Sequence, residues 1–464
     1  MFKKIEIWIL YLTIIISIII ALGFGVLVRQ ELEGVTKHGR IDISFLSKPA
    51  TYIARLPEQF LMLLVVPNKN RLSNPGSEVR DFYDQNGFDG TPNSSESYLL
   101  LSRYNGDLQE GVVELVDLTN FKILHTWNPD IDSFNELVEQ VDEFKYLVRD
   151  HSNQRQVLMH PKLTKDGGLI FGWGTPLHKI DFCSNLIFQN SDYSFHHAIE
   201  TDIDGNIWVP AYLYPQSLPI EKIGRSITDE DGYVDDAIVM LSQEGKILFE
   251  KSVSEIFIEN GLEYLLFAHG NDYEEDPIHL NDIQAVNYDG EFWKKGDVFL
   301  SVRNQSMIVL YRPSTNKIIW NGVGPFLHQH DVDIIDNHRI AVFNNRSINV
   351  VSGGNVVDGN NEIIIYDFYT DEFSTYLSDS MIKNDVRTIG EGRSEILPNG
   401  DLFVEESGYA RTLYFNKDGS VNWTHVNRAD NGHIYSVGWS RILYTQEDIQ
   451  AVINLLSNRG ICNE

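Results

Sequence analysis

Most of the chain consists of short hydrophobic runs that alternate with polar turn residues. From Tyr98 almost to the end, β-prone runs are separated by Asp-Gly, Asn-Gly and Asp-Asn pairs, a pattern typical of hairpins in small antiparallel sheets. One kind of strand–turn–strand segment recurs at residues 162–173, 198–212, 285–302, 332–345 and 395–407. A second hairpin recurs between or after them, at residues 178–188, 237–250, 307–320, 363–376 and 412–425.

A degenerate copy at residues 111–127 brings the repeat to six units of about four strands each. A β-sandwich explains alternating strands but not such a repeat, whereas a propeller requires it. The repeat therefore predicts an all-β fold, a six-bladed β-propeller over residues 98–444. We expect the final segment to pair with the first blade, and the helical pattern of the tail, residues 445–464, to pack on the outside.

The amino-terminal region has a different hydrophobic pattern. Lys3 and Lys4 precede an uncharged run over residues 7–28, which is long enough to cross a membrane and longer than the apolar part of a signal peptide. We expect residues 1–6 to form a cytoplasmic stub and residues 7–28 an uncleaved signal anchor. Residues 29–97 are expected to form a juxtamembrane helix, from Tyr52 to Val66, followed by a linker. The anchor predicts a single-pass protein of the inner membrane, with its propeller facing the periplasm or outside.

Charge and cysteine content narrow the functional classes. The formal net charge is −29, with 66 acidic and 37 basic residues, which argues against nucleic-acid binding because a phosphate backbone requires a basic surface. An anionic substrate would need local positive charge inside a pocket. Cys183 and Cys462 are the two cysteines, and an exported chain permits a disulfide between them.

Histidine recurs at one place in the repeat, just before the turn-containing segments. His160, the His196-His197 pair, His279 and His330 stand there in four units, and Arg393 stands there in another. Because propeller symmetry brings equivalent positions together around one axis, we expect these side chains to meet in the central channel. Arg303 ends the strand that follows His279, and we expect it to reach the same channel.

Three interpretations fit a ring of histidines. The ring can bind a metal, act as nucleophile and acid–base groups, or hold the blades together structurally. The arginines favour an oxyanion site, because a guanidinium beside a dication is unfavourable but clamps sulfate or phosphate well. We therefore predict no metal.

Three segments resemble signature blocks of bacterial arylsulfotransferases, which are exported six-bladed propellers. They are SFHHAIETDIDGNIWV, PIHLNDIQAV with GDVFLSVRNQSMIVLYRPSTNKIIW, and GPFLHQHDVDIIDNHRIAVFNN. The similarity extends over residues 95–430, in matching order and spacing. It implies transfer of a sulfuryl group from an aryl sulfate to a phenolic acceptor, with no nucleotide donor and no cofactor.

The resemblance also implies residue roles. His330 matches the histidine that is transiently sulfated, and His197, His279 and Arg303 match the groups around the sulfuryl oxygens. The candidates for substrate binding are Asn281, His196, His160 and Arg393. Two other functions stay open: a non-catalytic, membrane-anchored binding or scaffolding module, and a metal-dependent lyase or oxygenase on the same fold.

Finer expectations concern neighbouring polar residues. Strand alternation allows only one of His196 and His197 to face the channel, and it places Asp331 opposite His330, in a structural role. The acidic clusters at residues 229–231 and 274–276 are expected to lie in solvated loops.

Overall fold

The computed structural model describes residues 6–32, 37–38, 41–65, 84–224, 232–268, 273–349, 355–457 and 462. Two compact units divide the chain, Met1–Asn70 and Arg71–Glu464. The acidic cluster predicted at residues 229–231 lies outside the described residues, as does most of the predicted linker up to residue 83.

The amino-terminal unit contains two helices and a short hairpin. They are α1 (Ile7–Leu32), β1 (Lys37–His38), β2 (Ile41–Asp42) and α2 (Ser44–Val65). Residues Ile7–Gln30 of α1 form one helix that is long and apolar enough to cross a membrane, because a rise of about 1.5 Å per residue covers a hydrocarbon core of roughly 30 Å. The predicted juxtamembrane helix is present as α2, which begins eight residues earlier than the sequence pattern indicated.

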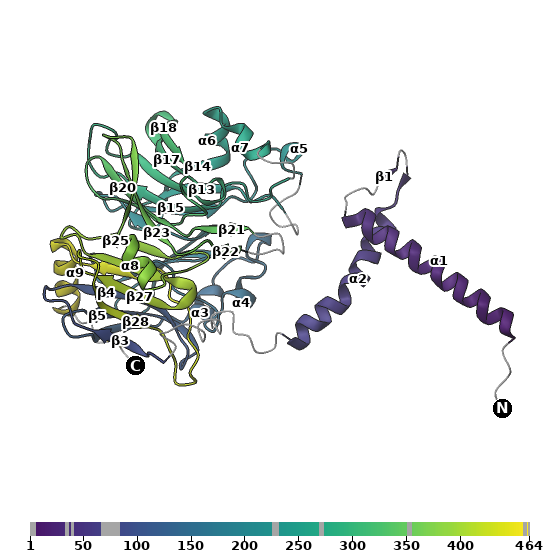
Figure 1. Ribbon diagram of the computed structural model, residues 1–464, viewed down its shortest axis with the longest axis horizontal. Helices are drawn as coiled ribbons and strands as arrows, with labels where there is room; N and C mark the ends of the chain where they lie inside the picture. The colour runs from purple at the N-terminus through teal and green to yellow at the C-terminus, as the bar shows by residue number, and fades with distance from the viewer. Residues whose placement is uncertain are drawn as a thin grey trace. The chain divides into compact units, whose positions relative to one another are not determined.

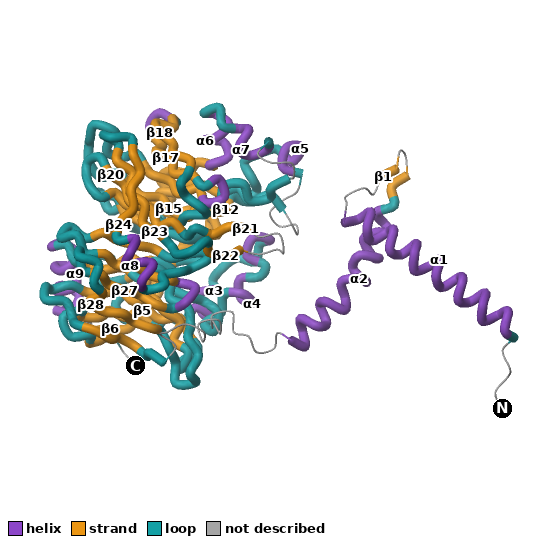
Figure 2. The backbone as a smooth tube through the Cα atoms, in the orientation of Figure 1, coloured by secondary structure: helices purple, strands orange, loops and turns teal. Residues whose placement is uncertain are grey.

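The second unit is a β-propeller-like arrangement of antiparallel sheets (Figures 1 and 2). One sheet contains β7 (Lys162–Leu163), β8 (Leu169–Phe171), β9 (Thr175–Ile180), β10 (Leu186–Phe195), β11 (Glu200–Thr201), β12 (Ile207–Tyr212), β13 (Asp236–Leu241) and β14 (Ile247–Ser252). The next contains β15 (Leu280–Ala285), β16 (Val298–Val302), β17 (Met307–Arg312) and β18 (Lys317–Val323). Another contains β19 (Val332–Ile334), β20 (Arg339–Asn344), β23 (Glu362–Asp367) and β24 (Glu372–Tyr376).

Two further sheets close the ring. One contains β25 (Arg393–Ile396), β26 (Leu402–Glu406), β27 (Arg411–Phe415), β28 (Val421–Val426) and β3 (Gly87–Gly90), and the other β29 (Arg441–Leu443), β4 (Tyr98–Asn105), β5 (Glu110–Asp117) and β6 (Lys122–Trp127). A small hairpin is formed by β21 (Ser347–Asn349) and β22 (Asn355–Val357). Because β10 pairs with β12, two runs of four strands share one eight-stranded sheet, and the sheets do not confirm the predicted six blades.

Helices occupy the connections and the tail. They are α3 (Ile131–Asn135), η2 (Asp142–Phe144), α4 (Leu147–Asp150), α5 (Ile220–Ile223), α6 (Val253–Glu259), α7 (Glu263–Phe267), η3 (Arg303–Gln305), η4 (Pro313–Thr315), α8 (Ser378–Lys383), η5 (Ser407–Tyr409) and α9 (Gln446–Ser457). The hydrophobic core lies largely between neighbouring sheets: one cluster, for example, joins Ile238 of β13 and Phe257 of α6 to Leu300 of β16.

Both ends of the propeller sequence take part in ring closure. As predicted, the final strand β29 pairs with β4, with Arg441 opposite Leu100. The predicted linker, however, contributes strand β3, which pairs with β28 from Gly87 to Gly90. Its sequence, GFDG, has no hydrophobic alternation, so this edge strand was not predicted.

The carboxyl-terminal tail forms the predicted helix and a disulfide. Cys183 and Cys462 are bonded, with their Cα atoms 5.4 Å apart. Val452 and Leu455 of α9 pack against the core between β4 and β8. The helix also borders the cavity at the centre of the sheets, so its position is not purely on the outside.

Six of the strands that line that central cavity are called the inner strands: β7, β11, β15, β19, β25 and β29. Residues that precede the inner strands lie at one end of the channel, and residues that follow them lie at the other end. The two ends therefore present different side chains.

Candidate active site

Six residues before the inner strands share a left-handed backbone. Each lies one to four residues before its strand, with φ between 43° and 57°. They are His160, His197, His279, His328, Glu391 and Trp439. Because residues other than glycine seldom adopt positive φ, its recurrence shows that the same bend is built into every repeat.

This register corrects one detail of the sequence alignment. His328, and not His330, occupies the position equivalent to His279. His330 lies two residues further along, where the equivalent residues are Asn281 after His279 and Arg393 after Glu391. The sequence pattern could not reveal this because it shows spacing and not backbone conformation.

Three of the predicted histidines lie together, and two of them contact Trp439. The ring centre of His197 lies 5.4 Å from that of His279 and 6.2 Å from that of His330. The ring of Trp439 lies 6.2 Å from both His197 and His330. His197 and His330 are buried, whereas the His279 side chain is 27% exposed, so His279 is the most outward member of the cluster.

Asp276 orients His279. The Nδ1 atom of His279 lies 2.5 Å from Oδ2 of Asp276, whose Oδ1 accepts a hydrogen bond from the backbone N–H of His279 at 3.2 Å. A carboxylate on Nδ1 fixes the ring and leaves Nε2 for the site. The expectation that residues 274–276 form only a solvated loop is therefore wrong for Asp276, although its place three residues before a candidate histidine was a usable signal.

His330 has partners on both ring nitrogens. Nδ1 lies 2.7 Å from the Oδ1 atom of Asn345, and Nε2 accepts the backbone N–H of Glu391 at 2.9 Å. Because an amide oxygen only accepts, the proton is on Nδ1 and the lone pair is on Nε2. This tautomer is the one that a nucleophilic Nε2 requires.

His197 faces the cluster and His196 faces away from it. The Nδ1 atoms of the two rings are 2.7 Å apart. His196 stacks on Tyr212 at 4.0 Å, and its Nε2 lies 3.0 Å from Oδ1 of Asp236. The structure thus resolves which of the two rings enters the site, and it places His196 behind His197.

Arg303 supplies positive charge to the same cluster. It begins the 3₁₀ turn η3 after β16 and is half-buried, and its Nη1 donates to Oδ1 of Asn304 at 2.6 Å. Within the described ranges, no carboxylate forms an ion pair with it. Its guanidinium is therefore available to an anion.

Burial lowers the pKa of three histidines of the site, His197, His328 and His330. Burial, followed by the charges of Arg303 and His279, holds the pKa of His330 well below its usual range. Burial and the neighbouring rings of His196 and His279 act in the same way on the pKa of His197. Burial lowers the pKa of His328 to about 4. Neutral imidazoles beside one guanidinium can act as nucleophile and base around an anion.

Three predicted substrate-binding residues make contacts within the protein. His160 contacts Arg441, with 2.6 Å between Nε2 and Nη2, and Arg393 lies 3.8 Å from Asp331. Asn281 is fully buried and donates from Nδ2 to the carbonyl of Gln329 at 3.0 Å. These contacts connect neighbouring strands, as does the bond from the Ser394 N–H to Asp331 at 2.9 Å, which agrees with the structural role expected for Asp331.

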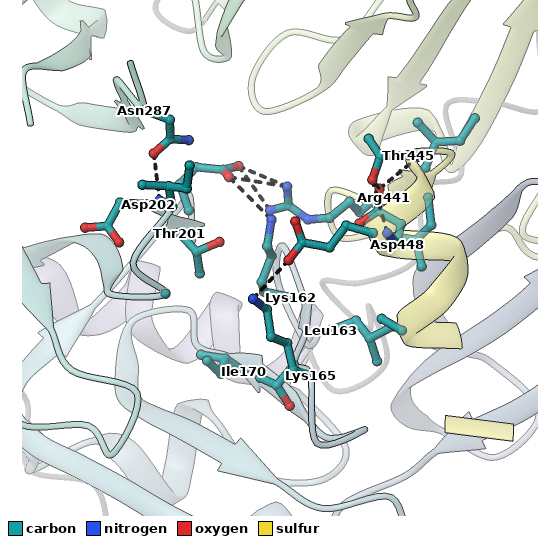
Figure 3. A pocket seen from close by; sticks show the side chains of 18 of the residues that line it. Lys162, Leu163, Lys165, Ile170, Thr201, Asp202, Asn287, Arg441, Thr445 and Asp448 are labelled. Atoms are coloured by element: carbon teal, nitrogen blue, oxygen red, sulfur yellow. Dashed lines mark hydrogen bonds and ion pairs between the residues drawn. The ribbon is translucent and has the colours of Figure 1, made fainter. Parts of the chain in front are cut away.

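The far end of the channel is a cavity of about 670 Å³ with mixed charge (Figure 3). Its wall includes Lys162, Glu200, Asp333, Arg393 and Arg441. Arg441 donates to Glu200 at 3.1 Å. Of the predicted residues, Arg393 lines this cavity, whereas the ring of His160 lies 5.3 Å from that of Trp439, behind the histidine cluster.

The structure adds five residues that the sequence reasoning did not assign to the site: Asp236, His328, Asn345, Glu391 and Trp439. His328 could have been found from its place two residues before His330. Asn345 ends a segment that already carried the family resemblance, whereas Asp236 had no local signal.

A metal site is not indicated in the portion of the chain that the structure describes, where no group of three or more histidine, cysteine or acidic side chains is arranged to hold an ion. The donor set agrees with this, because Arg303 would oppose a cation.

Comparisons with known proteins address the family and the fold. The model of the arylsulfotransferase (ASST) family matches residues 156–428, whereas none of the curated proteins matches significantly.

Solved structures that resemble the chain are distant. A Bacteroides caccae protein of unknown function is 11% identical, with a TM-score of 0.43 over 72% of this chain and 94% of that one. A streptogramin B lyase is 12% identical, with a TM-score of 0.34 over 76% and 96%. The WD40 propeller domain of Doa1 is 12% identical, with a TM-score of 0.37 over 79% and 95%. None of these likenesses bears on the activity.

The family match covers more than half of the chain and includes every residue of the histidine cluster, from His197 to His330, together with Arg303. The chain therefore belongs to the arylsulfotransferase (ASST) family.

Proposed function

We propose that this protein transfers a sulfuryl group from an aryl sulfate to a phenolic acceptor through a sulfohistidine formed on His330. The observation that carries the proposal is the convergence of His197, His279 and His330 with Arg303 at one end of the channel. Membership in the family supports the same reaction class.

In the first half-reaction, the Nε2 lone pair of His330 attacks sulfur. An N–S bond forms, the S–O bond to the aryl group breaks, and its electron pair leaves on the phenolate. Asn345 holds the proton on Nδ1, so Nε2 keeps its lone pair. In the second half-reaction, an acceptor phenol takes the sulfuryl group back from His330.

His330 must first release one hydrogen bond. Its Nε2 accepts the Glu391 N–H, and attack on sulfur requires this bond to break. Gly390 and Gly392 flank Glu391, and glycine gives a backbone unusual conformational freedom. Rotation of this segment is the expected step that frees the nucleophile.

Arg303 and His279 would bind the sulfuryl oxygens, where charge spreads in the transition state. A donor placed in this way contributes about 3–4 kcal/mol in other enzymes. Trp439 would form the wall of the site between His197 and His330. An aryl ring fits such a wall, because aromatic rings pack well edge-to-face.

We further propose six blades, with the propeller held outside the cytoplasm by α1. The recurrence of the left-handed residue before six inner strands supports the count. The bond between Cys183 and Cys462 supports an oxidising compartment, and Lys3 and Lys4 before the span support an amino end inside the cell.

The test uses the full-length chain in detergent, with a chromogenic aryl sulfate and a phenol. We expect release of the coloured phenol that is lost in His330→Ala and retained in His338→Ala, a control whose ring contacts Asn337 away from the site. Absence of turnover by the folded wild-type protein would contradict the proposal and favour the non-catalytic binding module.

A further inference from the structure

A chain of three side chains leads from the cluster into the protein interior. The Nδ1 atoms of His197 and His196 are 2.7 Å apart, and Nε2 of His196 lies 3.0 Å from Oδ1 of Asp236. All three side chains are buried. Of these three side chains, only His197 has its ring beside those of His279 and His330. His197 is therefore the member of the series that contacts the substrate.

The contacts link the tautomers of the two rings. Nε2 of His196 and Oδ1 of Asp236 are 3.0 Å apart but are not aligned for a hydrogen bond, so the link requires a small rotation of one side chain. With the link made and Asp236 ionised, His196 donates to it from Nε2 and accepts from His197 on Nδ1, which leaves a lone pair on Nε2 of His197. If Asp236 is protonated, every bond reverses and Nε2 of His197 carries a proton. The two arrangements differ by one proton at the substrate end.

Neither imidazole is suited to hold a positive charge. Burial lowers the pKa of His196 to about 3 and lowers that of His197 well below its usual range. Burial and the nearby Asp276 carboxylate raise the pKa of Asp236 well above its usual range. A proton that enters the chain at His197 is therefore better held at Asp236 than on either ring.

We propose that Asp236 and His196 form a proton relay with His197, in which His197 exchanges a proton with the phenolic oxygen and Asp236 stores it. This inference rests on the proposed function and assigns the acid–base part of the reaction. His197 is the catalytic member, because it alone touches the substrate. His196 and Asp236 act through it as positioning residues.

The steps balance over one reaction cycle. When an acceptor attacks, its O–H bond breaks and the proton goes to Nε2 of His197, while the Nδ1 proton of His197 passes to His196 and the Nε2 proton of His196 passes to Asp236. The phenolate oxygen bonds to sulfur, and the N–S pair returns to His330. When a donor is cleaved, the same protons move in reverse and protonate the departing phenolate.

The surroundings of Asp236 suit a proton store. Its Oδ2 accepts the N–H of Leu280 at 3.0 Å, and the charged or titratable groups around it are Asp235, Asp276, His279, His196 and Tyr212. Asp235 is bonded to Ser217 and Ser252. Within the described residues, no lysine or arginine forms an ion pair with Asp236, so ionisation is not favoured by a fixed cation.

The structure offers a matched control. Asp282 is also buried and also accepts a backbone N–H from the next inner strand, that of Val332, at 2.9 Å. Among the described residues, no histidine lies within ion-pair distance of Asp282, whereas His196 lies 3.0 Å from Asp236. Asp282→Asn therefore reports the structural cost of losing such a carboxylate, and Asp236→Asn reports that cost together with the loss of the relay.

The experiment compares acceptors with different acidity in the full-length protein, with a nitrophenyl sulfate as donor. The nitrophenolate leaving group needs no proton, and a nitrophenol acceptor is already ionised at about pH 8. A simple phenol, with a pKa near ~10, must lose its proton. General-base assistance is typically worth about 10²- to 10⁴-fold.

In Asp236→Asn, the amide donates to His196 and holds His197 in the tautomer that cannot accept a proton. We expect transfer to the simple phenol to fall at least about 10²-fold and to recover as the pH approaches the pKa of the phenol. The nitrophenolate burst and transfer to the ionised acceptor are expected to stay within a few-fold of wild type. His196→Phe should behave in the same way, and Asp282→Asn should discriminate little between acceptors.

Equal losses for all acceptors in Asp236→Asn would overturn the relay while leaving sulfuryl transfer intact. No burst in the wild-type protein would instead overturn the proposed function. Should Asp236→Asn fail to fold, His196→Phe decides the question through the same comparison of acceptors.

Discussion

At the start of the inner strands, the channel holds neutral histidines and one half-buried arginine without a carboxylate partner among the described residues. Next to this cluster, at the first residues of β25 and β29, the side chains of Arg393 and Arg441 lie among Glu200, Asp331 and Glu395 and border the cavity. The first arrangement leaves positive charge available to a ligand, and the second uses it within the protein. An arginine without a carboxylate partner can bind an anionic ligand, whereas a paired arginine stabilises the fold. This difference distinguishes a ligand site from a structural network.

Substitution of Arg393 should give the largest effect on stability. Arg393→Met leaves the buried Asp331 and the half-buried Glu395 without their cation, and breaking a buried pair typically costs about 3–5 kcal/mol. We expect a lower urea midpoint and an unchanged turnover per folded molecule. Loss of turnover without loss of stability would show that the far end of the channel is also part of the active site.

Substitution of Arg303 should have the opposite result. Arg303→Met removes a donor from the sulfuryl oxygens, and we expect turnover to fall about 10²- to 10³-fold. Stability should change little, because no ion pair is lost within the described residues. Urea unfolding together with steady-state kinetics checks both quantities, and a large drop in stability with full activity would reverse the comparison.

The disulfide should affect only the far end, where α9 borders the cavity. The double substitution of Cys183 and Cys462 by serine releases a link between residues 279 apart in the sequence, and we expect a loss of about 2–4 kcal/mol. Turnover measured well below the melting temperature should be unchanged. A changed KM for the aryl sulfate would indicate that the two ends communicate.

The smallest effect concerns the pH dependence of stability, which should differ in sign between the two ends. Burial and the nearby Asp331 raise the pKa of Asp333 well above its usual range, so the folded state binds more protons than the unfolded state and loses stability as the pH rises. Asp333→Asn should therefore stabilise the protein at pH 8, by roughly 1–2 kcal/mol, and have no effect near pH 3.

The matched substitution at the histidine end is His328→Gln. The pKa of His328 is lowered to about 4, so the unfolded state binds more protons between about pH 6.5 and 4, and stability is lost as the pH falls through that window. The substitution should stabilise the protein near pH 4 relative to pH 8. Equal pH profiles for both variants and the wild type would contradict the difference between the two ends.

Much of the fold was predictable, because turn pairs and hydrophobic alternation determine hairpins locally and their repetition indicates a propeller. The helix α1 and the pairing of β29 with β4 were predicted for similar reasons. The bond between Cys183 and Cys462 was left open as a pairing that export permits. Strand β3 was not, because Gly87–Gly90 has no strand pattern and pairs only through its contact with β28.

The residue types of the site were predictable from the sequence, but the position and the contacts of each residue in the channel were not. The repeat placed histidines and arginines at the channel, but spacing alone could not show which of them are paired within the protein, so His160 and Arg393 were assigned to the substrate. Nor could it show that His328 occupies the left-handed position. Asp236 joins the site from β13, 40 residues from His196, and only the sheet register brings the two together.

The central claim is that His330 carries the sulfuryl group. The most direct measurement is rapid quenching of the full-length protein after mixing with an aryl sulfate in the absence of acceptor, followed by peptide mass spectrometry at alkaline pH. We predict one added sulfuryl mass on the peptide that contains His330, which disappears when a phenol is added. An adduct on His197 or His279, or release of phenol with no adduct, would contradict the account.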